Sequence, residues 1–173
     1  DKGEDLMRKV SELLNIAPHH VRHLKENFYG PFDIEVHLGF DGRLYVVDPA
    51  RVMPSEVIDA RCTKITGSSL FCLHRPEFVR TLKEPVNPDA MLRVCTDTNI
   101  RDQRKKLQEA FKEHQKSHFT FFALNMSKLT AKALTENPSK IALWEKLGLI
   151  EAFHRNGFNV RHLYKIKECD PSP

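Results

Sequence analysis

A run of alternating apolar residues that leads into an Asp-Gly pair is the feature that most constrains the fold. Every second residue from Phe32 to Phe40 is apolar, and after Asp41-Gly42 comes the apolar segment 44–47. Alternation with a period of two is typical of a strand with one buried face. Asp-Gly between two such runs favours a two-residue type I′ turn, in which both central residues have a positive φ. The pattern therefore predicts a β-hairpin over about residues 32–48.

A two-residue loop would also fix which residues of the two strands lie opposite each other. One face would carry three pairs: Phe40 with Arg43, Leu38 with Tyr45, and Val36 with Val47. The other face would carry the remaining three: Gly39 with Leu44, His37 with Val46, and Glu35 with Asp48. The first face is mostly apolar, whereas the other carries a small polar group.

Helical periodicity and helix-end signals account for most of the remaining chain. Pro18 ends the first apolar pattern, Pro76 lies in the first turn of a short helix, and Asn137 and Gly157 are suited to the two ends of the last helix. The predicted helices cover residues 4–15, 75–79, 100–115, 119–134 and 138–155. Residues 49–75 read as an irregular connection with one helical turn after Pro54, and residues 158–166 as a short extended segment.

These elements predict an α+β fold: a helix-rich single domain in which one β-hairpin packs against several helices, with the 138–155 helix at the centre. A third strand could extend the hairpin. A length of 173 residues with 40% hydrophobic content suits one domain. The first residue, Asp1 rather than Met, and the tail over 168–173, which reads as a linker, suggest a fragment of a larger protein.

Composition favours a cytoplasmic protein without membrane insertion. No apolar run approaches the roughly 20 residues that span a bilayer. The four cysteines are few and irregularly spaced, unlike the dense disulfide frameworks of small secreted domains. The 27 basic and 23 acidic residues give a net charge of +4, an excess that permits nucleic-acid binding without requiring it.

Three strings of residues, in the same order along the chain, resemble the clustered-mitochondria (Clu) domain family. The longest runs from Gly39 to Pro54 and carries Gly-x-Asp-Gly-Arg-x-Tyr-x-x-Asp-x-x-Arg-x-x-Pro; the others are Arg75–Phe78 and Gly157–Leu163. The resemblance implies a cytosolic, multidomain protein linked to mitochondrial distribution and to messenger RNA or translation. It also implies structural roles for ten motif residues: Asp41, Gly42, Arg43, Tyr45, Asp48, Arg51, Arg75, Pro76, Glu77 and Arg161.

Acidic and basic residues crowd the hairpin and allow two interpretations. Glu35, His37 and Asp48 could form a kinase-like acid/base or metal site, which would make the protein a nucleotide- or metal-dependent enzyme. However, the sequence has no Gly-rich loop, strand lysine or catalytic-loop Asn around these residues. We therefore favour the second interpretation, in which an Asp48–Arg51 ion pair fastens the hairpin to the loop that follows it.

A basic stripe on the predicted 100–115 helix is a candidate contact for RNA phosphates. Its members project to one side of the helix: Arg101, Arg104, Lys105, Lys112 and Lys116. Asp102, Glu109 and Glu113 lie three or four residues from these cations, at the spacing of intrahelical ion pairs. An ordinary solvated helix face is therefore the favoured interpretation, with RNA contact as the alternative.

Two groups of residues could ligate a metal but lack the expected spacing. Cys62, Cys72, His74 and Cys95 contain no Cys-x-x-Cys pair that would pre-set two ligands. His19, His20 and His23 follow Pro18 closely, but surface histidines explain them as well. We therefore expect no metal and no cofactor, and a non-catalytic interaction or scaffolding module whose partners are other proteins and neighbouring domains, with RNA as a further candidate.

Overall fold

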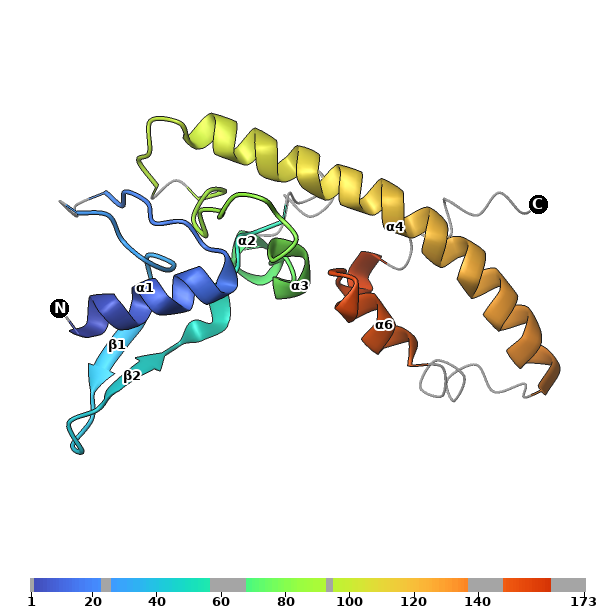
Figure 1. Ribbon diagram of the computed structural model, residues 1–173, viewed down its shortest axis with the longest axis horizontal. Helices are drawn as coiled ribbons and strands as arrows, with labels where there is room; N and C mark the ends of the chain where they lie inside the picture. The colour runs from blue at the N-terminus through green and yellow to red at the C-terminus, as the bar shows by residue number, and fades with distance from the viewer. Residues whose placement is uncertain (1, 23–25, 57–67, 93–94, 137–147, 163–173) are drawn as a thin grey trace. The chain divides into compact units, whose positions relative to one another are not determined.

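The computed structural model describes residues 2–22, 26–56, 68–92, 95–136 and 148–162. Over these residues the chain forms α-helices and a two-stranded antiparallel sheet (Figure 1), which confirms the α+β class predicted from the sequence. The chain divides into two compact units, residues 1–108 and 109–173. The single domain expected from the length stays a prediction.

The first unit begins with helix α1, Lys2–Leu14, close to the predicted range of 4–15. The helix ends where Asn15 adopts a left-handed conformation with φ 60°. The Ile16 N–H donates to the Ser11 carbonyl over 2.8 Å, which caps the helix with the bonding pattern of a Schellman motif. The Asn15 side-chain amide donates to two backbone carbonyls of the 79–82 segment, and so ties the helix end to α3, Pro76–Val79.

The predicted hairpin is present, with strands β1, Glu35–Leu38, and β2, Leu44–Val47. Its predicted turn is wrong. The Gly42 N–H donates to the Gly39 carbonyl and the Gly39 N–H to the Arg43 carbonyl, so three residues form the loop instead of two. Gly42 has φ 74°, whereas Asp41 has no positive φ, so the loop lacks the second positive φ that a type I′ turn needs.

The longer loop shifts the strand register by one residue from the predicted pairs. Val36 pairs with Val46 and Leu38 with Leu44, which places four aliphatic side chains on one face. The other face carries the remaining two pairs: Glu35 with Val47 and His37 with Tyr45. A slip of one residue moves every side chain of a strand relative to its predicted partner. The hairpin is therefore more clearly amphipathic than predicted.

The connection after the hairpin contains short helices. A 3-10 turn, Pro49–Arg51, follows β2 directly, and α2, Ser68–Phe71, precedes α3. Pro76 lies in the first turn of α3, which confirms the predicted short helix there. The helical turn expected after Pro54 falls largely on residues 57–67, which lie outside the described residues. No third strand joins the sheet among the described residues.

A single 37-residue helix, α4, Ile100–Glu136, replaces the two helices predicted over 100–134. This stretch contains no glycine or proline that would interrupt the helix. The aromatic run near Phe119 lies within this helix. None of the described helices is both long and apolar enough to cross a bilayer.

The second unit contains the later part of α4 and a shorter C-terminal helix than predicted. Helix α6 runs from Leu149 to Arg155, and Gly148 before it has φ 57°. A left-handed residue cannot continue a right-handed helix, so the predicted 138–155 helix is wrong in its extent; its start at Asn137 lies outside the described residues. Gly157, with φ 80°, ends α6 as predicted.

The segment after α6 is compact rather than extended. Val160–His162 form a 3-10 turn, which contradicts the extended segment predicted to begin at residue 158. Phe158 is fully buried, and its ring contacts those of Phe119 and Phe153 at centroid distances of 4.7 and 5.4 Å. The second unit therefore has an aromatic core. The first unit has an aliphatic and aromatic core that includes Met7, Ile16, Val21, Met53, Phe78, Val79, Ala90 and Leu107.

Candidate interaction surface

Arg51, which follows the hairpin, is a buried cation held by two carboxylates. Its guanidinium donates to both carboxylate oxygens of Asp33, over 2.9 and 2.5 Å, and to Asp89 over 2.7 Å. Only 4% of Arg51 is exposed, and its guanidinium also lies 4.9 Å from the Phe32 ring centroid. Planar, bidentate pairing of this kind fixes geometry as well as charge. Arg51 thus joins both ends of the hairpin to the 87–92 segment.

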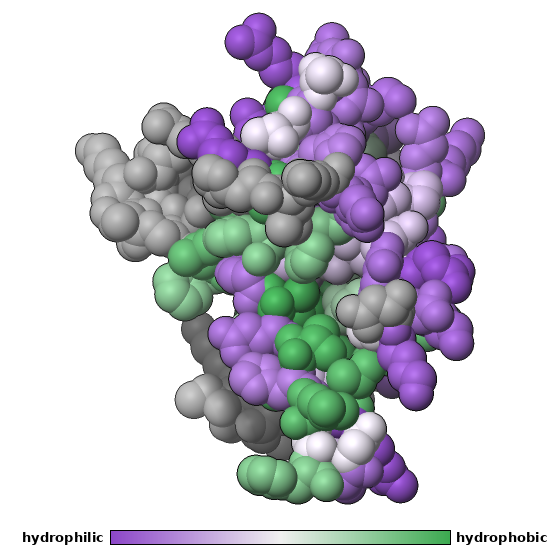
Figure 2. Space-filling model, turned by 90° about the vertical axis from the view of Figure 1, so that its left-hand side faces the viewer, coloured by the Kyte–Doolittle hydropathy of each residue, from purple (hydrophilic) through white to green (hydrophobic). Residues whose placement is uncertain are grey.

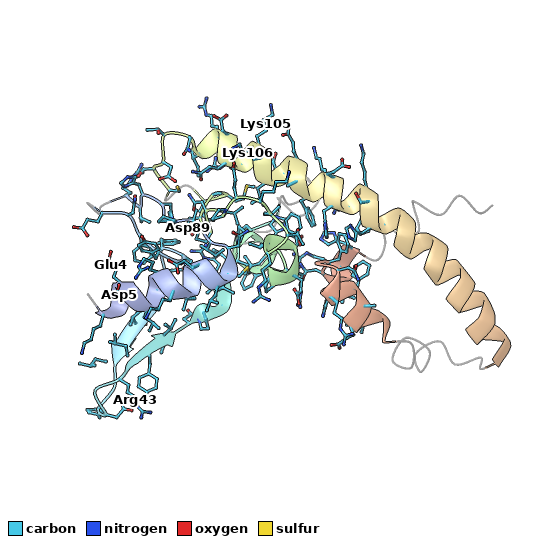
Figure 3. All side chains as sticks on the ribbon, in the orientation of Figure 1. Glu4, Asp5, Arg43, Asp89, Lys105 and Lys106 are labelled. Atoms are coloured by element: carbon cyan, nitrogen blue, oxygen red, sulfur yellow. The ribbon has the colours of Figure 1, made fainter. Side chains whose placement is uncertain are left out.

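Asp89 is the centre of this network and is completely buried (Figure 3). Its carboxylate accepts hydrogen bonds from Arg51, from the buried His19 ring over 2.9 Å and from the Phe32 N–H over 2.8 Å. Burial raises the pKa of Asp89, but the hydrogen bonds and charges of His19 and Arg51 outweigh it, so the pKa is lowered overall. Asp89 is therefore a carboxylate that balances Arg51 inside the first unit.

Asp48 does not take part in this network. It is exposed, has a left-handed conformation with φ 51° and stands before the 3-10 turn without a side-chain capping bond. The predicted Asp48–Arg51 pair is therefore wrong: Arg51 is the expected fastening residue, but its partners are Asp33 and Asp89.

The acid/base candidates of the hairpin form a local surface pair. The His37 ring and the Glu35 carboxylate are 2.9 Å apart on the same face of β1, and both side chains are more than half exposed. Among the described residues, no group of three or more His, Cys, Asp or Glu could hold a metal ion. The buried carboxylate of Asp89 bonds to Arg51 and His19. Glu35, His37 and Asp48 are exposed and do not share an enclosed site with this carboxylate.

A polar latch holds the hairpin turn. The Tyr45 hydroxyl donates to Asp41 over 2.7 Å, and the other Asp41 carboxylate oxygen accepts from the Arg43 N–H over 3.1 Å. The bond from Tyr45 is the main cause of the lowered pKa of Asp41, and in return Asp41 raises the pKa of Tyr45. The Tyr45 ring lies over Gly39, where a Cβ atom would come within 2.6 Å of it.

The hairpin face that carries the four aliphatic side chains is partly open to solvent, with Leu44 and Val46 half-buried. Leu38 is 70% exposed, Val36 is 36% exposed, and Phe40 at the turn is fully exposed. Figure 2 shows apolar residues gathered in the lower half of this side of the molecule, where the hairpin lies in Figure 1. Exposed apolar groups that are contiguous on a surface are typical of interaction sites. We call the face formed by Val36, Leu38, Leu44 and Val46 the aliphatic face.

Exposed cations lie along α4, but not every member of the predicted stripe is exposed. Arg101, Lys105, Lys112 and Lys116 are exposed. Arg104 is not, because its guanidinium donates to the Ala90 and Leu92 carbonyls. A further cation, Lys106, is exposed and pairs with Glu84 over 3.1 Å (Figure 3). The structure therefore places Arg104 with the polar contacts that hold the 87–92 segment.

The other motif residues and the metal candidates lie apart from the hairpin. Arg75 and Glu77 form a two-bonded ion pair at the start of α3, next to Pro76, and Arg161 is exposed on the 3-10 turn after α6. His74 and Cys95 are buried, and Cys72 is a half-buried free thiol. Cys62 and His23 lie outside the described residues.

Two residues of the Arg51 network were missed by sequence reasoning. Asp89 belongs to none of the motifs, and Asp33 stands out only as one of the acidic and basic residues that crowd the hairpin. A single aspartate in a Pro-Asp-Ala context carries no periodic signal. The available hint was indirect: a buried arginine needs carboxylate partners, and Asp33 and Asp89 are acidic residues next to an aromatic or a proline. Because 56 residues separate Asp33 from Asp89, local sequence patterns do not show that both bind the same arginine.

The comparison with known families points to the hairpin end of the chain. Residues 1–58 match the family model CLU, described as Clustered mitochondria. The resemblance predicted from the 39–54 string is thereby confirmed over these residues, while the strings at 75–78 and 157–163 lie outside the match. No curated protein and no solved structure gives a match to the chain.

Proposed function

We propose, with the match of residues 1–58 to the Clustered mitochondria family as the premise, that this chain is a non-catalytic protein-interaction module with a role related to mitochondrial distribution. It acts in the cytoplasm within a larger, multidomain protein. The hairpin is the contact surface, and the Arg51 network is the internal brace that holds it. Asp41, Gly42, Arg43, Tyr45 and Arg51 serve this arrangement structurally.

The partly exposed aliphatic face carries the proposal. Leu38 and Phe40 project from a short sheet whose loop is fixed by the Tyr45–Asp41 latch. An exposed leucine alone has no meaning, because more than half of a protein surface is apolar. Four aliphatic residues on one side of two paired strands, beside a fully exposed phenylalanine, form a contiguous surface that gains free energy when a partner covers it.

The enzyme alternative has weaker support. Its candidate residues, Glu35, His37 and Asp48, are solvent-exposed side chains on a thin hairpin, where water would compete with any substrate contact. A thermal-shift titration with ATP and Mg²⁺ separates the two functions, since a ligand at 100 times its dissociation constant adds about 2.7 kcal/mol of stability. We expect no shift; ATP turnover that Asp48→Ala abolishes would favour the enzyme.

The test of the interaction module uses the chain expressed in cells as a fluorescent fusion. It should alter the distribution of mitochondria by competing for the partner of the parent protein. Leu38→Asp places a charge on the aliphatic face and should abolish the effect. Leu13→Asp is the matched control, because Leu13 on α1 is 76% exposed and lies outside the hairpin. The proposal fails if both variants act alike, or if the fusion leaves mitochondria unchanged.

RNA contact through α4 is a second candidate, favoured by the exposed Arg101, Lys105, Lys112 and Lys116. These cations recur along one helix, which suits the phosphates of a nucleic-acid backbone. Glu109 and Glu113 interleave with them and weaken the local positive potential. This candidate therefore predicts modest affinity that falls steeply with salt.

A further inference from the structure

We propose that the outer edge of β2 pairs with β2 of a second copy of this chain, which joins the two hairpins into a four-stranded antiparallel sheet. The inference deepens the proposed function, on which it rests, by naming one partner of the hairpin. It depends on three observations: the hydrogen-bond phase of the hairpin, the uncharged composition of β2, and the charges at the two ends of that strand.

The hydrogen-bond phase shows which backbone groups point outward. Gly39 donates to Arg43, and these residues stand opposite each other in the register that pairs Leu38 with Leu44. Bonded and non-bonded pairs alternate in an antiparallel ladder. His37–Tyr45 and Glu35–Val47 are therefore the bonded pairs. The N–H and C=O groups of Leu44 and Val46 point away from β1, toward the outer edge of β2.

Within the described part of the chain no strand pairs with the outer edge of β2, whereas β1 carries polar, charge-bearing side chains. Natural edge strands commonly avoid association by placing charged side chains along the edge. Strand β1 carries Glu35 and His37, and Figure 1 draws it on the side of the hairpin toward α1. Strand β2, with the sequence Leu-Tyr-Val-Val, has no charged residue and forms the outer border of the hairpin in the same view.

The sequence of β2 is self-complementary about Tyr45. In an antiparallel pair centred on this residue, Leu44 lies opposite Val46 of the second copy, and Val46 opposite Leu44. These are the residues whose backbone groups point outward, so the two strands exchange four hydrogen bonds without any change of face. The two aliphatic faces then become continuous. The Tyr45 rings meet on the opposite face as a cross-strand aromatic pair, which is a favourable contact.

Charge complementarity fixes the antiparallel direction and the second copy as occupant. Arg43 precedes β2 with its side chain 81% exposed, and the exposed Asp48 follows the strand. A two-fold axis through Tyr45 brings the positive end of each strand to the negative end of the other. A parallel arrangement would place like charges side by side. Two-fold, isologous contacts are also the commonest form of homo-oligomer.

The first test is the mass of the chain in solution, measured by sedimentation over a range of concentrations. We expect a monomer–dimer equilibrium. Val46→Pro removes an N–H that points outward, so it should raise the dimer dissociation constant by at least about tenfold while the hairpin stays paired. Val36→Pro is the matched control: it removes an outward N–H from the protected edge and should leave the dissociation constant unchanged.

The second test is a cross-link on the proposed axis. Cβ atoms of directly opposed residues lie about 4.5–5.5 Å apart, close to the range of a disulfide. Tyr45→Cys should therefore give a covalent dimer under mild oxidation. His37→Cys places a thiol on β1, on the same face of the sheet as Tyr45, and its yield of covalent dimer should not exceed the wild-type background from the native thiols. Circular dichroism of both variants establishes that the fold is kept.

A chain that stays monomeric up to about 1 mM overturns the inference, because such weak pairing amounts to less than about 4 kcal/mol. So does a dimer that Val46→Pro and Val36→Pro affect equally, or one whose Tyr45→Cys variant does not cross-link. Failure here leaves the proposed function standing if Leu38→Asp still abolishes the effect on mitochondria, since the aliphatic face would then bind another protein. Loss of both results would remove the hairpin as a contact surface.

Discussion

Arg51 shows why one charged side chain can matter more than several on the surface. Its guanidinium is buried with the fully buried Asp89 on one side and Asp33 on the other. Removing one member of a buried ion pair leaves an uncompensated charge, whereas an exposed charge interacts mainly with water. The structural role predicted for the Asp48–Arg51 region therefore rests on Arg51 alone.

Arg51→Met should lower the free energy of unfolding by about 3 kcal/mol or more, because Asp89 would stay buried without its cation. Asp48→Asn is the matched control, and should change it by no more than about 0.5 kcal/mol, as is usual for exposed positions. Urea titration of both variants measures the difference. Equal losses would show that Asp48 carries structural energy that its exposed position does not reveal.

His114 gives the second unit a pH dependence. Burial lowers the pKa of His114, the bond to the Asn156 carbonyl opposes this, and the neighbouring His118 lowers the pKa further. A folded-state pKa below the unfolded value near 6.5 means that protonation favours the unfolded chain. The stability that depends on neutral His114 is complete above about pH 6.5 and is lost as the pH falls through the folded-state pKa.

His114→Gln keeps an amide N–H that can donate to the Asn156 carbonyl but does not titrate. Its stability should fall less than that of the wild type between about pH 7 and 5. His154→Gln on α6 removes a different histidine and should keep the wild-type slope. Urea midpoints at several pH values provide the comparison, and identical slopes for all three proteins would contradict the assignment to His114.

At the scale of elements, the hairpin turn depends on the latch between Tyr45 and Asp41. Asp41→Asn replaces the carboxylate whose hydrogen bond raises the pKa of Tyr45, so we expect that pKa to fall toward its ordinary value. Ultraviolet titration of tyrosinate, with Tyr45→Phe to identify the signal, measures the shift. An unchanged pKa would mean that the Tyr45 hydroxyl does not bond to Asp41 in solution.

Helix α4 separates a binding role from a structural one. If α4 contacts RNA, Arg101→Glu and Lys112→Glu should weaken binding and reduce its salt dependence, with little effect on stability. Arg104→Glu should instead destabilise the first unit, because its guanidinium donates to the Ala90 and Leu92 carbonyls. Fluorescence anisotropy with single-stranded RNA, alongside thermal melts, distinguishes these effects. RNA affinity that is independent of salt would exclude α4 as the contact.

Local sequence patterns predicted the helices and strands of this fold better than the turns and boundaries between them. The helix over 4–15, the short helix at Pro76 and the Gly157 stop follow from residues within one or two turns. The turn at Asp41-Gly42 was missed because the same two residues fit loops of two or three residues, and only the number of positive φ angles separates them. Residues around 116–119 suggested a break in α4, yet no residue there interrupts a helix.

At the scale of the whole molecule, the sequence motif of the hairpin predicted the family resemblance but not the side-chain contacts of the motif residues. The 39–54 string identified the family that residues 1–58 match. The partners of Arg51 were not predictable, since Asp33 and Asp89 lie 18 and 38 residues away from it in sequence. Side-chain contacts over such separations depend on how the chain folds back, which periodicity does not encode.

Amide hydrogen exchange across the hairpin, measured residue by residue on the 173-residue chain at increasing dilution, tests most directly whether this surface is open for binding. We predict protection of His37, Tyr45 and Val47 at every concentration, because their N–H groups bond within the hairpin. Leu44 and Val46 should exchange rapidly when dilute and gain protection as the concentration rises, while Val36 and Leu38 stay unprotected. Protection of Leu44 and Val46 at all dilutions would mean that the chain itself covers this edge, and would contradict the account.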